Sequence, residues 1–137
     1  MRHPLFLASF LFLPMLAACS SATDGPLGVA RVPANTTCAY TATIVPLDGP
    51  LDVPKNSTGN QAPFRVTNTS AAGCSIVFTF TATTTVGFTV TQTPSFLTLA
   101  SGASTNVQAR FSATSKPSGT LTLSWTTVSG VHTLHAI

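Results

Sequence analysis

The sequence predicts an all-β fold, an antiparallel β-sandwich of about seven short strands. From residue 38 onward, apolar side chains alternate with polar ones at a period of two, as in strands with one buried face. Turn-forming residues separate these runs at short, even intervals. No run shows a helical period or a capping box. These observations together indicate an all-β domain.

Seven alternating runs account for the expected strands, and β-branched and aromatic residues dominate them, as a pleated surface prefers. In chain order the runs fall at 40–44, 64–66, 76–82, 88–90, 107–111, 121–125 and 131–137. Turns are expected at 48–50, 68–73, 87, 94–95, 101–102, 117–119 and 129–130.

The same alternation predicts the core. Burial of one Phe or Leu side chain contributes about 1.5–3 kcal/mol, so the apolar positions can support a core without a metal. The residues expected to point inward are Phe64, Val66, Ile76, Phe78, Phe80, Phe88, Val90, Val107, Phe111, Leu121, Leu123 and Trp125. The pattern leaves Phe96, Leu97 and Leu99 unassigned.

Residues 1–18 form a predicted signal peptide. Arg2 and His3 precede an apolar run at 5–18, which is shorter than the roughly 20 residues that a membrane-spanning helix needs. The run ends in Leu16-Ala17-Ala18-Cys19, which resembles the lipobox of bacterial lipoproteins. The alternative is ordinary cleavage after small residues, with Cys19 as a spare thiol.

The lipobox resemblance implies that Cys19 becomes the mature N-terminus and carries a diacylglycerol and an N-acyl chain such as palmitate, with no other cofactor. Two or more acyl chains anchor a protein stably to a membrane. Ser20 stands where an inner-membrane lipoprotein would have aspartate, which by resemblance favours the outer membrane, facing the periplasm or the cell surface. A Gram-positive host would offer no such choice.

The mature chain divides into a tether and one domain. Residues 19–37 hold the lipidated terminus and a Ser-, Thr-, Gly- and Pro-rich segment without periodicity, typical of a flexible linker. Residues 38–137 have the length of a single β-sandwich.

Two cysteines, Cys38 and Cys74, are left once Cys19 carries lipid. An exported, oxidising setting favours a disulfide between them, which would stabilise the domain. The alternative is two buried free thiols that behave as small apolar side chains.

Five motifs resemble the immunoglobulin-like domains of the ASH/MSP/HYDIN group and related bacterial modules. They lie at 51–53 (LDV), 64–70 (FRVTNTS), 87–90 (GFTV), 99–107 (LASGASTNV) and 119–123 (GTLTL). The resemblance implies an immunoglobulin-like sandwich with a scaffolding or binding role and carries no catalytic residues. Ser70-Ala71-Ala72-Gly73-Cys74 replaces the usual tight turn, so we expect a longer loop held by Cys74.

Composition argues against several activities. The six Lys and Arg residues are scattered, so no basic stripe for nucleic acid is expected, and the chain contains no glutamate. His132 and His135 would point to opposite faces of a strand, which disfavours a shared metal, and both are expected to be exposed or on an edge strand. The chain is therefore not expected to be an enzyme.

The last strand is the candidate partner-binding site. A sandwich with few charges on its strands has little protection against pairing with another chain. Strand addition to a partner, or self-assembly, is therefore predicted there, at Val131, His132, Thr133, Leu134 and His135.

The predicted function is a membrane-anchored, non-catalytic lipoprotein whose domain binds or scaffolds proteins in secretion, pilus or conjugation machinery, or in surface adhesion. The alternative is an inhibitor or immunity-type lipoprotein against a cell-wall hydrolase; a hydrolase ranks last.

Overall fold

Ten β-strands and their connections make up residues 37–137, the part of the chain that the computed structural model describes. In chain order the strands are β1 (Ala42–Pro46), β2 (Leu51–Val53), β3 (Asn60–Asn68), β4 (Ile76–Phe78), β5 (Thr81–Thr84), β6 (Phe88–Gln92), β7 (Leu97–Leu99), β8 (Ser104–Ala113), β9 (Ser118–Trp125) and β10 (Val128–Ala136). The all-β prediction is confirmed, with more strands than the seven expected. The predicted signal peptide, Cys19 and all of the tether except its last residue lie outside the described residues.

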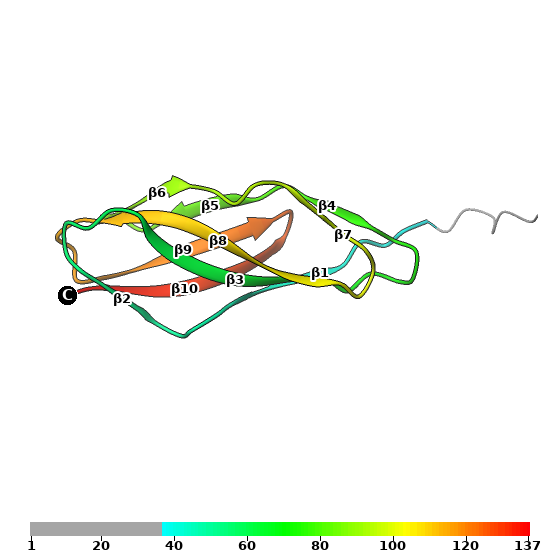
Figure 1. Cartoon of the computed structure of the whole chain (residues 1–137), viewed down its shortest axis with the longest axis horizontal. Helices are drawn as coiled ribbons and strands as arrows, with labels where there is room; N and C mark the ends of the chain where they lie inside the picture. Colours follow the sequence, from blue (N-terminus) through cyan, green and yellow to red (C-terminus); the bar gives the residue numbers. More distant parts are fainter. Residues whose placement is uncertain (1–36) are drawn as a thin grey trace, which may run out of the picture. The chain divides into compact units, whose positions relative to one another are not determined.

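The strands form two four-stranded sheets and one two-stranded sheet. Their orders are β1-β3-β8-β6, β2-β10-β9-β5 and β4-β7, and every pair is antiparallel except β2 with β10. In Figure 1, β3 and β8 overlie β9 and β10, and β4 and β7 lie at the end of the domain opposite the C-terminus. Fully buried side chains from both four-stranded sheets, among them Phe64, Phe111 and Leu121, fill the space between the layers.

The structure has three more strands than predicted, because β2 lies outside the seven predicted runs, one run divides in two, and β7 includes Leu97 and Leu99, which the pattern left unassigned. The run predicted at 76–82 divides into β4, which pairs with β7, and β5, which pairs with β9. The run predicted at 88–90 is β6, which pairs with β8, and the chain then changes partner, because β7 pairs with β4. The period-two pattern predicts which residues face inward but not which strand lies beside them. The sequence therefore did not predict where the chain changes from one neighbouring strand to another.

The turn predicted at 129–130 is wrong. The hairpin bends at Thr126 and Thr127, and Gly130 lies inside β10, opposite Leu123. A Cβ atom on Gly130 would lie 2.7 Å from the carbonyl oxygen of Ile44, so β1 approaches the inner face of β10 too closely for any side chain. Glycine here permits close packing of two layers and marks no turn.

The predicted core is largely confirmed. The members that the structure buries are Phe64, Val66, Ile76, Phe78, Phe88, Phe111, Leu121 and Leu123. Phe80, Val90, Val107 and Trp125 are half-buried, and the Trp125 ring lies 4.8 Å, centroid to centroid, from the Phe78 ring. Of the three unassigned residues, Leu99 is buried, Leu97 is half-buried and Phe96 is 75% exposed.

Asn68 holds together the end of the domain that contains β4 and β7. Its side chain is fully buried, and Nδ2 donates to the carbonyl oxygens of Cys74 at 2.8 Å and Leu99 at 2.9 Å. Its Oδ1 accepts from the backbone N–H of Ser70 at 2.9 Å. One amide thus links the end of β3 to the residues just before β4 and at the end of β7, and all of its polar atoms have partners.

The disulfide between Cys38 and Cys74 is present, with the two Cα atoms 5.6 Å apart. It joins the segment before β1 to the loop before β4. Cys74 is therefore held twice, by the disulfide and by the Asn68 amide that binds its carbonyl oxygen.

Replacing both Cys38 and Cys74 with alanine should lower the free energy of unfolding by about 3–4 kcal/mol, because the open chain regains the entropy of a 36-residue separation. Urea unfolding with and without reductant measures this. Reductant should destabilise the wild type by a similar amount and leave the double variant unchanged; an unaffected wild type would contradict the prediction.

Asn68→Ala should lower the free energy of unfolding by about 3 kcal/mol, because it leaves two carbonyl oxygens and one N–H buried without partners. Asn68→Asp should cost more, since a carboxylate would face the carbonyls of Cys74 and Leu99. Asn60→Ala is the matched control on β3, because it removes a single partly buried bond to Ser57. Equal losses for Asn60→Ala and Asn68→Ala would count against this role.

Candidate binding groove beside strand β8

The predicted partner-binding strand is not a free edge. β10 lies between β9 and β2, and its residues Leu134 and His135 pair with β2. Val131, His132 and Thr133 have a ladder on the β9 side alone. The prediction of a free edge strand is thus wrong at Leu134 and His135, because β2 returns to this position from far back in the sequence and pairs in parallel.

His132 is 1% exposed, which corrects the prediction of an exposed or edge histidine. Its ring nitrogens Nε2 and Nδ1 lie 2.6 Å and 3.2 Å from the carbonyl oxygens of Pro63 and Gly49. The ring also meets Phe64 edge-on, with centroids 4.7 Å apart. His132 therefore fastens the loop after β1 to β3 and is not available to a ligand.

His135 lies on the opposite face of β10, where its Nδ1 is 3.2 Å from Oδ1 of Asp52 at the surface. Surface pairs of this kind contribute little to stability. Within residues 37–137, no three His, Cys, Asp or Glu side chains gather closely enough to hold a metal ion.

The longest unpaired stretch of the first sheet lies on β8. β3 pairs with β8 from Ser104 to Phe111, whereas β6 pairs only with its residues 110–113. Beyond Gln92 the chain leaves β8 to form β7 against β4, and it rejoins β8 only through the turn at 100–103. Residues 104–109 of β8 therefore have a neighbouring strand on one side only.

Hydrogen bonds at the two ends of β8 fix which backbone groups face the unpaired side. Asn68 N–H donates to the carbonyl of Ala103, and on the other side Thr114 N–H donates to the carbonyl of Gly87. Along an antiparallel ladder the backbone N–H and C=O groups of successive residues point to alternate sides of the strand. The backbone groups of odd-numbered β8 residues therefore point toward β3, and those of even-numbered residues point away from it. Asn106 and Gln108 thus direct their N–H and C=O groups into the space that β6 leaves empty.

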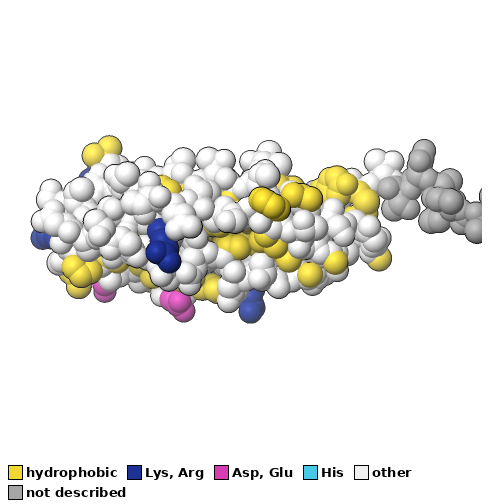
Figure 2. Space-filling model, turned by 45° about the horizontal axis from the view of Figure 1, so that its top comes forward, with side chains coloured by type: hydrophobic (Ala, Val, Ile, Leu, Met, Phe, Trp, Pro, Cys, Tyr) yellow, Lys and Arg dark blue, Asp and Glu magenta, His cyan; other side chains and the backbone are white. Residues whose placement is uncertain are grey.

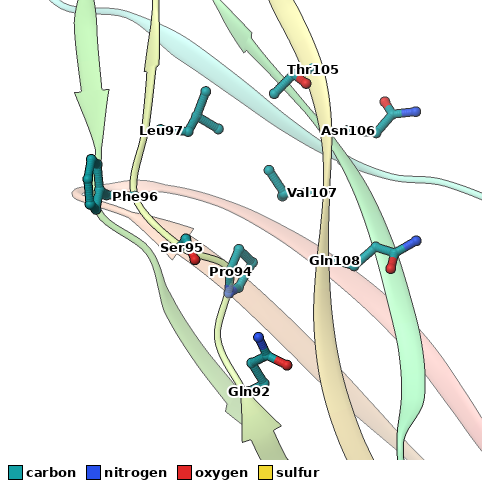
Figure 3. A pocket seen from close by; sticks show the side chains of 9 residues that line it. All are labelled: Gln92, Pro94, Ser95, Phe96, Leu97, Thr105, Asn106, Val107 and Gln108. Atoms are coloured by element: carbon teal, nitrogen blue, oxygen red, sulfur yellow. The ribbon is translucent and has the colours of Figure 1, made fainter.

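A groove of about 340 Å³ occupies that space, and it is lined by Gln92, Pro94, Ser95, Phe96, Leu97, Thr105, Asn106, Val107 and Gln108. In Figure 3, Val107 and Leu97 point into the groove from its two sides, whereas the side chains of Asn106 and Gln108 point away from it. Phe96 projects to the far side of its own segment and is 75% exposed. The groove thus has an apolar interior, a polar backbone edge and an exposed aromatic ring beside it.

No ionisable side chain lines the groove, and the nearest charges along the strands are cations. Arg110 follows the groove on β8, and Arg65 lies opposite Asn106 on β3. Both are exposed on the outer face of the sheet. Figure 2 shows one face of the molecule, on which charged side chains are isolated among neutral polar and apolar ones.

A second, smaller hollow of about 270 Å³ lies near the disulfide and is lined by Tyr40, Ser75, Ile76, Val77 and Trp125. Tyr40 and Val77 are more than half exposed. Its lining residues Ile76 and Val77 belong to β4, which pairs with β7 alone. This strand has only three residues, so it offers a shorter unpaired side than β8 does.

Neither hollow was predicted from the sequence. The signal that was available for the groove is Pro94-Ser95, a turn pair inside an otherwise strand-like run, which marks where the chain leaves β8.

None of residues 37–137 forms a helix with the length and apolarity needed to cross a bilayer. No protein-family model matches the chain, and no protein of curated function matches its sequence.

His132→Phe should lower the free energy of unfolding by about 2 kcal/mol, because an aromatic ring remains but the ring nitrogens beside the partly buried carbonyls of Pro63 and Gly49 are lost. Thermal unfolding measures the loss, and hydrogen exchange should show faster opening at residues 47–50. His135→Phe is the matched control and should change stability by about 0.5 kcal/mol or less. If His132→Phe lost no more stability than His135→Phe, the hydrogen bonds of His132 would not contribute to stability and the prediction would be wrong.

Proposed function

We propose that this chain is a bacterial lipoprotein, anchored through lipid on Cys19, whose immunoglobulin-like domain binds a protein partner in a cell-envelope assembly. The basis for the anchor is the order of the N-terminal features: a cationic start, a short apolar run and Leu16-Ala17-Ala18-Cys19. The assembly would be secretion, pilus or conjugation machinery, or an adhesive surface layer. Ser20 favours an outer-membrane location.

The observation that carries the binding role is the unpaired edge of β8 beside an apolar groove. Sheet edges of this kind invite pairing, and proteins normally protect them with lysine, proline, a bulge or a covering segment. The edge at residues 104–109 carries neither lysine nor proline. A domain that leaves such an edge open can use it to recognise another chain.

Charge favours this role over that of a wall-hydrolase inhibitor. Residues 37–137 contain the acids Asp48 and Asp52 against two lysines and two arginines, so with neutral histidines the domain is cationic. A cationic hydrolase would be repelled by such a surface. Cross-linking in detergent-solubilised envelopes separates the two: subunits of an assembly support binding within a machine, and a captured hydrolase supports inhibition.

Cys19→Ser should abolish metabolic labelling with a palmitate analogue and should shift the protein from the membrane fraction to the soluble fraction, because only a cysteine accepts the diacylglycerol. Gel fluorescence and intact-mass spectrometry provide the measurement. Replacing both Cys38 and Cys74 with serine is the matched control, and labelling should persist in it. A labelled Cys19→Ser protein, or an unmodified Cys19 thiol in the wild type, would refute the anchor.

A further inference from the structure

We propose, building on the protein-binding role above, that the groove beside β8 accepts an extended peptide segment of a partner protein as an added strand. The segment would have apolar residues alternating with acidic ones. It would pair with the unpaired edge of β8 at residues 104–109, next to the 93–97 segment.

The backbone carries the first part of this recognition. Asn106 and Gln108 each present an N–H and a C=O toward the groove, and no residue from 37 to 137 pairs with these groups. The two residues are one strand repeat apart, which is the spacing at which the backbone of a neighbouring strand repeats its own donors and acceptors. An extended peptide satisfies all four groups at once, whereas a compact ligand would not.

The side chains define the apolar half of the segment. Alternate residues of an added strand would point to the same face as Val107, toward Leu97 and Pro94. These contacts are apolar, and no charged group lies among them to pair with a buried charge. Apolar residues at every second position therefore fit, with Phe96 available to extend the contact outside the groove.

Charge defines the other half of the segment and disfavours a second copy of this chain. The remaining residues of the segment would share the outer face with Gln108 and Arg110, and Arg65 lies one strand further on. Opposite charges on neighbouring strands attract and like charges repel. Acidic residues would therefore meet cations, whereas a second β8 would bring another Arg110 to the same face.

The test uses the full lipidated protein in detergent micelles and three synthetic eight-residue peptides. In the first, valine alternates with aspartate; in the second, valine alternates with lysine; the third has the composition of the first arranged in two blocks. Fluorescence anisotropy should show binding of the first, a dissociation constant at least about fivefold higher for the second, and no binding of the block peptide. Equal binding of all three would overturn the proposal.

Hydrogen exchange locates the added strand in the wild type. The N–H groups of Asn106 and Gln108 should gain protection when the alternating aspartate peptide binds, while those of Thr105 and Val107 are already protected by β3. Protection that appears on another strand instead would overturn the proposal. Protection of Asn106 and Gln108 without peptide, rising with protein concentration, would assign the edge to a second copy and also overturn it.

Gln108→Pro and Gln108→Ala form the matched pair of variants. Proline removes the N–H that faces the groove without removing a bond to β3, and proline is tolerated at sheet edges, so the fold should survive while peptide affinity falls about tenfold. Alanine keeps the N–H and should bind within about twofold of wild type. If Gln108→Pro does not fold, the wild-type exchange experiment decides. If no peptide binds while cross-linking still captures a partner, strand addition is wrong and the binding role stands.

Discussion

The buried amide of Asn68 is the interaction on which the arrangement of this domain most depends. At this point three segments meet: the end of β3, the residues before β4, six positions further along the chain, and the end of β7, 31 positions further along. Each would leave a backbone group without a partner if the amide were absent. The disulfide acts at the same place, because Cys74 is joined both to Cys38 and to Asn68. A covalent bond and three hydrogen bonds thus fix one end of the sandwich.

This fixed end explains why the groove exists. β7 is held at Leu99 by the Asn68 amide and along its length by β4, so it cannot close onto β8 as an ordinary hairpin. At the other end, Gln92 of β6 pairs with Arg110. The chain between these two points bends away from β8 and leaves Asn106 and Gln108 with free backbone groups. The unpaired edge therefore follows from how the sheets are joined and is not a defect of β8 itself.

The low charge of the domain has opposite consequences inside and outside. Inside, the buried polar side chains Asn68, Ser70 and His132 take part in hydrogen bonds, and no buried side-chain polar atom of residues 37–137 lacks a partner. Outside, scarcity of lysine and glutamate leaves the strands without the charges that usually prevent edge pairing. For a protein held at a membrane, as proposed, an open edge is suited to a neighbour in the same envelope.

The sequence alone determined the fold class, the inward face of nearly every strand and the cysteine pair, because alternation and cysteine count are local or compositional properties. It also supplied the only argument for a lipid anchor. It did not determine which strands are neighbours: Gly130 resembled a turn but lies where β1 approaches β10, and His132 resembled an edge residue but is buried. The candidate unpaired stretch lies instead at residues 104–109 of β8, an inner strand whose neighbour β6 pairs only with residues 110–113. Only the tertiary structure decided these points, since a strand becomes an edge through what packs beside it, and those partners lie far away in the sequence.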